Sequence, residues 1–322
     1  MSASADHAAW VVAPTEERNP HTLDIDLRTT IDILHMINDE DARVPRAVRD
    51  ALPALAAAVE LGVAALRGGH RVHYFGAGTS GRMAVLDAAE LIPTYDLEPS
   101  WVVAHHAGGA QAMKQPIEDV EDDEAGGAAE AAGLGPGDVA IGLTASGRTP
   151  YVTGALRAAR ARGAGTVLIS ANPGAALGTE VDVHVGVSTG PEVIAGSTRM
   201  KAGTAQKLLL NAFSTALMVR MERTYSNLMV AVAARNAKLR GRVVRILVEA
   251  TGLDPQTCAL AARQAGGDCR VALVSLLAGV PAGTARQALA ASSGGVRRAL
   301  TVAQAAGTEI EVTVSSAERA QT

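Results

Sequence analysis

The sequence predicts an α/β protein in which helices flank a doubly wound parallel sheet. Further helices are expected at the N-terminal end, and a small three-helix domain at the C-terminal end. Between about residues 68 and 190, short apolar runs alternate with segments of helical periodicity, as in parallel strands joined by crossover helices. Two of these runs lead into turns rich in glycine, serine and threonine. From residue 203 onward the periodicity is helical only.

The N-terminal region is expected to be a loose leader followed by two helices. Residues 1–22 show no clear period. Apolar residues from Leu27 to Ile37 then follow a helical spacing, which ends at a charged stretch. A longer amphipathic pattern covers residues 46–67 and ends at Gly68-Gly69, since glycine commonly follows the last turn of a helix.

The central region is expected to hold five strands and the helices between them. The strands are predicted at Arg71–Phe75, Trp101–His106, Asp138–Leu143, Thr166–Ser170 and Val181–Val187. Helices are predicted at Tyr151–Arg162 and at Arg82–Leu91, which Pro93 is expected to stop.

The remaining chain is expected to be helical. Long apolar patterns run from Ala205 to Glu222 and from Leu228 to Val248. Three short helices are predicted after them, at Asp254–Ala265, Cys269–Leu277 and Pro281–Ala290. The polar, alanine-rich residues 303–322 are expected to form a disordered tail.

The composition excludes several classes of function. Of the 322 residues, 48% are apolar, which is enough for a sizeable core, but only 2% are aromatic. Proteins that hold single-stranded nucleic acids by stacking need several exposed rings. The 29 basic and 33 acidic residues give a net charge of −4, so no basic surface for a nucleic acid is expected. Any anionic ligand is therefore expected to be small and held by local geometry.

Cysteine content and the lack of targeting patterns suggest a cytoplasmic protein. Cys258 and Cys269 lack the flanking ligands of a zinc site and are expected to be reduced thiols. Residues 1–14 do not have the pattern of a signal peptide. No apolar run approaches the roughly 20 residues that span a bilayer. We therefore expect no metal and no membrane partner.

A glycine-rich turn follows the first predicted strand. Residues Gly76–Gly81 read Gly-Ala-Gly-Thr-Ser-Gly between a strand and a helix, as in dinucleotide-binding proteins. Those proteins also need a carboxylate at the end of the second strand, where this chain has His105-His106. The histidine pair is interpreted as structural. The turn still offers backbone N–H groups to an anion, together with the hydroxyl groups of Thr79 and Ser80.

A second turn of this kind, Thr144–Thr149, follows the third predicted strand. Because the carboxyl ends of parallel strands lie at one sheet edge, we expect both turns to bind one phosphate group. The residues predicted to bind it are Gly78, Thr79, Ser80, Ser146, Gly147 and Thr149. In the alternative interpretation, the serines and threonines of these turns only cap helices.

These motifs, with further blocks in the same order, resemble the N-acetylmuramic acid 6-phosphate etherase family. The resemblance extends from about residue 15 to residue 300. The blocks are Thr15-Glu-Glu-Arg-Asn-Pro20, Ile37-Asn-Asp-Glu-Asp41, Gly76–Arg82, Asp87-Ala-Ala-Glu90, Thr144–Tyr151, Ser170-Ala-Asn-Pro173, Gly196-Ser-Thr-Arg-Met-Lys-Ala-Gly-Thr-Ala-Gln-Lys207 and Ser226-Asn-Leu-Met-Val230. The block from Gly196 to Lys207 is highly specific.

The resemblance implies a sugar isomerase (SIS) domain, which binds phosphosugars, over residues 46–225 and a helical C-terminal domain over residues 226–302. Residues 1–45 are then a leader with a helix, and residues 303–322 a tail. The implied protein is a homodimer and a lyase of peptidoglycan recycling. It would cleave the lactyl ether of N-acetylmuramic acid 6-phosphate to N-acetylglucosamine 6-phosphate and D-lactate.

The implied reaction needs an acid and a base but no cofactor. In the open-chain sugar the C2 proton lies next to an aldehyde, and the lactyl ether at C3 is a β leaving group. Elimination followed by hydration can then use one acid–base pair in both directions. The resemblance assigns the general acid to Glu90 and the C2 base to Glu121. Without the resemblance, Glu121 is one member of an acidic run, which is usually a solvated surface.

Other residues of the matched blocks are substrate-binding candidates. Ser197 and Lys201 are predicted to bind the substrate, and Arg199 is a further candidate for balancing its charge. The chain departs from the family where Leu91-Ile92-Pro93-Thr94 replaces Cys-Pro-Pro-Thr, and where Ala110 replaces a glutamate. These changes leave open the conformation of the backbone beside Glu90 and how the substrate is recognised there.

The position of Glu90 suggests a site shared between subunits. It follows Gly81 by nine residues, or about 13 Å along a helix, which exceeds the span from C6 to C2 of a hexose. We therefore expect Glu90 to serve the phosphate site of a neighbouring subunit. Two other functions remain open: a sugar-phosphate-binding regulator without catalysis, and an aldose–ketose phosphosugar isomerase.

Overall fold

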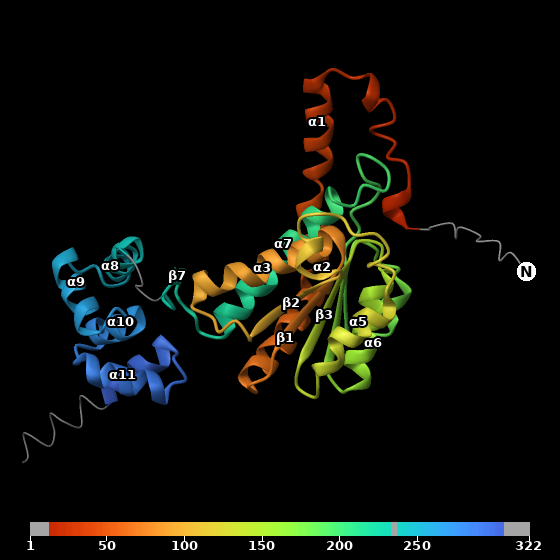
Figure 1. Ribbon diagram of the computed structural model, residues 1–322. Helices are drawn as coiled ribbons and strands as arrows, with labels where there is room; N and C mark the ends of the chain where they lie inside the picture. Colours follow the sequence, from red (N-terminus) through yellow and green to blue (C-terminus); the bar gives the residue numbers. More distant parts are fainter. Residues whose placement is uncertain (1–12, 233–236, 306–322) are drawn as a thin grey trace, which may run out of the picture. The chain divides into compact units, whose positions relative to one another are not determined.

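The computed structural model describes residues 13–232 and 237–305, which form two compact units. One unit combines the chain up to Ala89 with Pro99–Ser214, and the other combines Glu90–Glu98 with the chain from Thr215 onward. The first unit contains the sheet and the second contains the C-terminal helices (Figure 1). The domain boundary near residue 225 stays a prediction.

The five predicted strands form one parallel sheet in the order β2-β1-β3-β4-β5. They are β1 (Val72–Gly76), β2 (Val102–His106), β3 (Val139–Thr144), β4 (Gly165–Ser170) and β5 (Val183–Gly186). The chain runs from β1 to β2 on one side and then returns to β3 on the other, so the strand order reverses between β1 and β3. Doubly wound sheets bind ligands beyond the carboxyl ends of the strands at such a reversal. The register pairs Gly76 with Leu143, which brings the two predicted turns side by side.

Helices bury the strands, as the continuous apolar runs require. Phe75, Ala140 and Leu168 share one apolar core with α6 (Pro150–Ala161). The preceding residue of β1, Tyr74, points to the other face and makes an edge-on contact with Phe213 of α7 (Lys201–Arg220), at a centroid distance of 6.2 Å. The long helix α2 (Val44–Arg67) contacts β1, β3 and β5.

The N-terminal segment differs from the expected loose leader. Among its described residues, Thr15, Asn19 and Thr22 are buried. The helix predicted next is α1 (Thr30–Asp41), capped by Thr29, whose hydroxyl accepts a hydrogen bond from the Asp32 N–H. The sequence pattern does not predict the order in residues 13–22 because the side chains of Asn19 and Thr22 bind partners far away in the chain rather than forming a local repeat.

Three further differences from the prediction are local. Helix α3 (Gly78–Tyr95) passes through Pro93 and ends two residues later, so the proline lies in its last turn. The short helices α4 (Gly109–Ala112) and α5 (Glu124–Glu130) were not predicted. Where the sequence predicts only helix, β6 (Thr224–Tyr225) and β7 (Leu228–Met229) form a small antiparallel hairpin, and Ser226 between them has a φ of 52°.

The C-terminal unit confirms the three predicted short helices: α9 (Pro255–Gln264), α10 (Cys269–Ala278) and α11 (Ala282–Ala291). They pack with α8 (Ala237–Thr251) around a core that includes both cysteines, which are free thiols. Asp254 and Asp268 cap α9 and α10 by accepting backbone N–H hydrogen bonds. Residues 303–305 are helical, and the rest of the predicted tail lies outside the described residues. In the described ranges, no helix has the length and apolar character needed to cross a membrane.

Candidate active site

The first turn brings β1 and α3 into very close contact. A Cβ atom on Gly81 would lie 2.5 Å from the carbonyl oxygen of Gly76 and equally close to the ring of His106, so only glycine fits there. Both ring nitrogens of His106 face carbonyl oxygens, with Nδ1 at 2.8 Å from Ala107 and Nε2 at 3.2 Å from Gly78. His106 therefore holds the turn in place, in agreement with its structural interpretation.

The second turn is held by its own hydroxyl groups. The Oγ1 atoms of Thr144 and Thr149 lie 2.7 Å apart, and the Gly147 N–H donates to Thr144 Oγ1. Ser146 Oγ accepts from the Arg148 N–H at 3.2 Å. Thr149 stands at the N-cap of α6, yet its side chain makes no capping hydrogen bond. Helix capping therefore does not account for the Thr149 hydroxyl.

The two turns line one cavity of about 450 Å³. Five of the predicted phosphate-binding residues line it, namely Gly78, Thr79, Ser80, Ser146 and Thr149. Gly147 and Ser197 do not line it themselves, although their neighbours Ser146, Arg148 and Thr198 do. The sheet topology thus brings together donors that lie far apart in the sequence.

Charge is unevenly distributed in this cavity. Among the described residues that line it, Arg148 carries the one positive charge, while Glu16, Glu121 and Asp122 carry negative charges. A phosphate dianion is repelled by carboxylates, so it fits best beside Arg148 and the hydroxyl groups of the turns. The sequence does not single out Arg148 or Glu16 as site residues, and the matched blocks that contain them were the available signal. Thr198, like Ser197, is a sequence candidate either for hydrogen bonding to the sugar or for capping the helix that follows.

Glu121 lies where two cavities meet. It lines the first cavity and also a second one of about 260 Å³, whose lining includes Gly78, Arg82 and His106. The Glu121 carbonyl oxygen accepts a hydrogen bond from the Tyr151 N–H at 3.0 Å, which fixes this segment against the start of α6. Glu121 therefore shares the first cavity with the two turns.

Glu90 lies in α3, exposed, on the segment that belongs to the C-terminal unit. It lines neither of these two cavities. One turn earlier, the buried Asp87 accepts hydrogen bonds from Tyr74 Oη at 3.1 Å and from Ser214 Oγ at 2.9 Å. Burial raises the pKa of Asp87 to about 6, because neither hydroxyl supplies a positive charge. Asp87 thus fastens α3 to β1 and α7.

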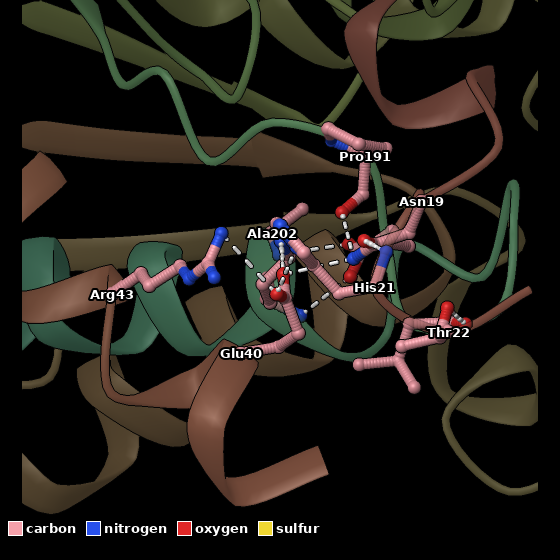
Figure 2. A network of polar contacts seen from close by, with 10 residues as sticks. Asn19, His21, Thr22, Glu40, Arg43, Pro191 and Ala202 are labelled. Carbon is pink, nitrogen blue, oxygen red and sulfur yellow. Dashed lines mark hydrogen bonds and ion pairs between the residues drawn. The ribbon is translucent and has the colours of Figure 1, made fainter. Parts of the chain in front are cut away.

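Lys201 is buried and belongs to a polar network around Glu40. Figure 2 shows Glu40 with its partners Asn19, His21 and Arg43. The Lys201 Nζ atom donates to Glu40 Oε2 at 2.6 Å, and Asn19 Nδ2 donates to the same oxygen at 2.8 Å. Glu192 caps α7 by accepting hydrogen bonds from the N–H groups of Lys201 and Ala202. Lys201 does not line the cavity. Its contact with substrate stays a prediction. In the structure, its ammonium group forms an ion pair with Glu40.

His105 belongs to a separate cluster. Its ring stacks on Phe75, its Nε2 atom lies 3.0 Å from Nδ1 of His73, and its Nδ1 atom lies 3.2 Å from Glu130. The Tyr151 hydroxyl donates to the same glutamate at 2.8 Å. Burial lowers the pKa of His73 to about 4 and also lowers the pKa of His105, which reduces charge repulsion between the two rings. Within the described ranges, no cluster of His, Cys, Asp and Glu side chains could hold a metal ion.

Comparison with known proteins gives consistent matches. The family model of the glucokinase regulatory protein N-terminal SIS domain matches residues 54–160, and the SIS domain model matches residues 111–216. An N-acetylmuramic acid 6-phosphate etherase from Thermobifida fusca is 65% identical over 83% of this chain and 88% of its own. The protein of the same name from Cutibacterium acnes is 50% identical over 90% of this chain and 96% of its own. Among solved structures, a phosphoheptose isomerase from Francisella tularensis matches 59% of this chain and 98% of its own, at 19% identity and a TM-score of 0.48.

Proposed function

This chain belongs to the N-acetylmuramic acid 6-phosphate etherase family, and from that premise we propose how it cleaves the lactyl ether of its phosphosugar substrate. The observation that carries the proposal is the cavity that the two turns and Glu121 line together. In the proposal, the phosphate binds to the N–H and hydroxyl groups of the turns, with Arg148 beside it. We expect the carbon chain of the sugar to extend from there toward Glu121.

Elimination is the first chemical step. Glu121 removes the C2 proton of the open-chain sugar, whose aldehyde stabilises the negative charge that develops. The bond between C3 and the ether oxygen breaks, and Glu90 donates a proton to that oxygen as D-lactate leaves. Glu121 is then protonated, Glu90 is ionised, and the sugar is an α,β-unsaturated aldehyde.

Hydration restores both groups. Glu90, now ionised, takes a proton from the water that attacks C3, and Glu121 returns a proton to C2. The product is N-acetylglucosamine 6-phosphate, and no electron acceptor or organic cofactor is consumed. The enzyme is accordingly a carbon–oxygen lyase, which we assign to cytoplasmic recycling of peptidoglycan sugars.

The proposal includes a homodimer. Glu90 follows the first turn by nine residues of a continuous helix, about 13 Å along its axis. We propose that Glu90 of one subunit acts on substrate bound to the turns of the other. A mixed dimer of Glu90→Gln and Ser146→Ala subunits should then regain activity in one of its two sites. If neither site recovers activity, the shared site is refuted.

Two measurements separate the steps. Wild-type protein should release D-lactate from N-acetylmuramic acid 6-phosphate and introduce deuterium at C2 when the reaction runs in D₂O. Glu121→Gln should lose both signals, whereas Glu90→Gln should lose lactate release and keep exchange at C2. Sugar phosphate that binds unchanged, without lactate release by the wild type, would refute the activity and indicate a regulator. Conversion of a 2-hydroxy aldose phosphate to a ketose phosphate would indicate an isomerase.

A further inference from the structure

One wall of the cavity comes from the N-terminal segment. Glu16 ends the 3₁₀ helix η1 (Pro14–Glu16) and lines the cavity together with Gly196 and Thr198. The carbonyl oxygen of Thr15 accepts a hydrogen bond from the Gly196 N–H at 2.9 Å. Thr22 Oγ1 donates to the Val193 carbonyl oxygen at 2.8 Å. Residues 13–22 therefore lie along the loop 191–198 and are tied to it at these two points and at a third, through Asn19.

Buried groups keep this segment in position (Figure 2). Asn19 Nδ2 donates to Glu40 Oε2 and also approaches the Pro191 carbonyl oxygen at 3.3 Å. Glu40 also forms an ion pair with Lys201, and both side chains are almost completely buried. Burying such a pair costs the hydration of both charges, a cost that a segment exposed to solvent would not require. The network instead fixes where the residues next to the cavity lie.

The loop leaves room for the Glu16 carboxylate. Gly196 has a φ of 76°, and a Cβ atom placed on it would lie 2.9 Å from Glu16 Oε2. Glycine at this position therefore allows both the turn and the close approach of the carboxylate. Within the part of the chain that the structure describes, no ion pair or hydrogen bond is made by the Glu16 side chain. Its acceptor oxygens are available at the cavity edge.

We propose that Glu16 is a substrate-contacting residue whose carboxylate accepts hydrogen bonds from hydroxyl or amide N–H groups of the bound sugar. It sets specificity for the uncharged part of the ligand, since a carboxylate repels the phosphate and accepts strong hydrogen bonds from neutral donors. The phosphate then occupies the end with Arg148 and the two turns. This inference rests on the proposed function only in taking the ligand to be a sugar phosphate.

Two binding measurements test the assignment with a matched control. Glu16→Ala and Glu17→Ala remove the same charge from adjacent exposed positions, but Glu17 lines neither cavity described above. Calorimetry should show that Glu16→Ala weakens binding of N-acetylglucosamine 6-phosphate by roughly 10- to 100-fold, as expected for loss of charge-assisted hydrogen bonds. Binding of inorganic phosphate should stay unchanged or become tighter, because a repelling charge is lost. Glu17→Ala should leave both affinities within about twofold of the wild type.

The outcomes are distinct. If Glu16→Ala leaves sugar phosphate affinity within twofold of the wild type, the contact does not exist. If it weakens both ligands equally, Glu16 only supports the turns, and the inference is refuted as well. These experiments measure binding without turnover. A wild-type protein that binds the sugar phosphate but releases no lactate would therefore overturn the proposed function and leave the test of Glu16 intact.

Discussion

Lys201→Met is expected to destabilise the protein strongly, although the substitution is apolar and similar in length. The Lys201 and Glu40 side chains are 2% and 3% exposed, and the charged atoms lie 2.6 Å apart. Removing the lysine leaves the Glu40 carboxylate buried without its closest cation. Breaking a buried pair in this way costs about 3–5 kcal/mol. Arg43, at 3.3 Å from Glu40 and half-exposed, and the hydrogen bond from Asn19 compensate in part, so we expect about 3 kcal/mol.

The assay is urea unfolding followed by far-UV circular dichroism. Lys207 lies on the same helix and is exposed, so Lys207→Met is the matched control, expected within about 0.5 kcal/mol of the wild type. The midpoint for Lys201→Met should fall while the slope with urea stays constant. A midpoint equal to that of the control would refute the reasoning, because the pair would then contribute nothing to the fold.

The pH dependence gives an independent check on the same pair. Burial alone would raise the pKa of Glu40, but hydrogen bonds from Lys201 and Asn19 outweigh it and hold the pKa below the ordinary value of 4.5. A carboxyl group with a lowered pKa in the folded state stabilises the fold above its unfolded pKa. That stability is lost as the pH falls through the folded value. The difference in unfolding free energy between wild type and Lys201→Met should therefore be largest near pH 7 and shrink below about pH 4.

Three further predictions concern the turns and α3. Asp87→Asn should flatten the dependence of Tm on pH between about 4 and 7. Its pKa of about 6, against the ordinary 3.8, means that the ionised form costs folded wild type roughly 3 kcal/mol at neutral pH, a cost that vanishes as the carboxyl group is protonated. Gly81→Ala should lower stability by at least about 2 kcal/mol in urea unfolding and weaken phosphate binding, since its Cβ would meet a backbone oxygen at 2.5 Å. Gly133→Ala, where a Cβ meets open space, is its control. Arg148→Met should weaken inorganic phosphate binding about 10-fold in calorimetry and leave Tm nearly unchanged.

The sheet and the two turns could be predicted because their signals are local. Each strand is a short apolar run, and each turn joins a strand to a helix within six residues. The position of the cavity follows from the topology alone, because the strand order reverses between β1 and β3. Glu121 lines that cavity, although its sequence context is only an acidic run, and its role as the base stays a prediction.

The buried residues that support the cavity could not be predicted from local patterns. Lys201 was expected to bind the substrate because its block is specific and it carries a positive charge. Its nearest partner, Glu40, lies 161 positions earlier in the chain, and no local pattern connects the two. The order in residues 13–22 has the same origin, since Asn19 and Thr22 bind the loop after residue 190.

The burial of Lys201 against Glu40 also bears on how the cavity selects its ligand. Because the Lys201 ammonium group is not part of the lining, Arg148 is the one cation among the described lining residues, which also include three carboxylates. Free phosphate therefore gains little net Coulomb attraction in this cavity. Affinity must then come from directed hydrogen bonds of the two turns and from contacts to the sugar. A ligand without the sugar keeps the repulsion and loses those contacts. We therefore expect a cavity built in this way to discriminate a sugar phosphate from inorganic phosphate more sharply than a lysine-lined pocket, in which charge alone would retain either ligand.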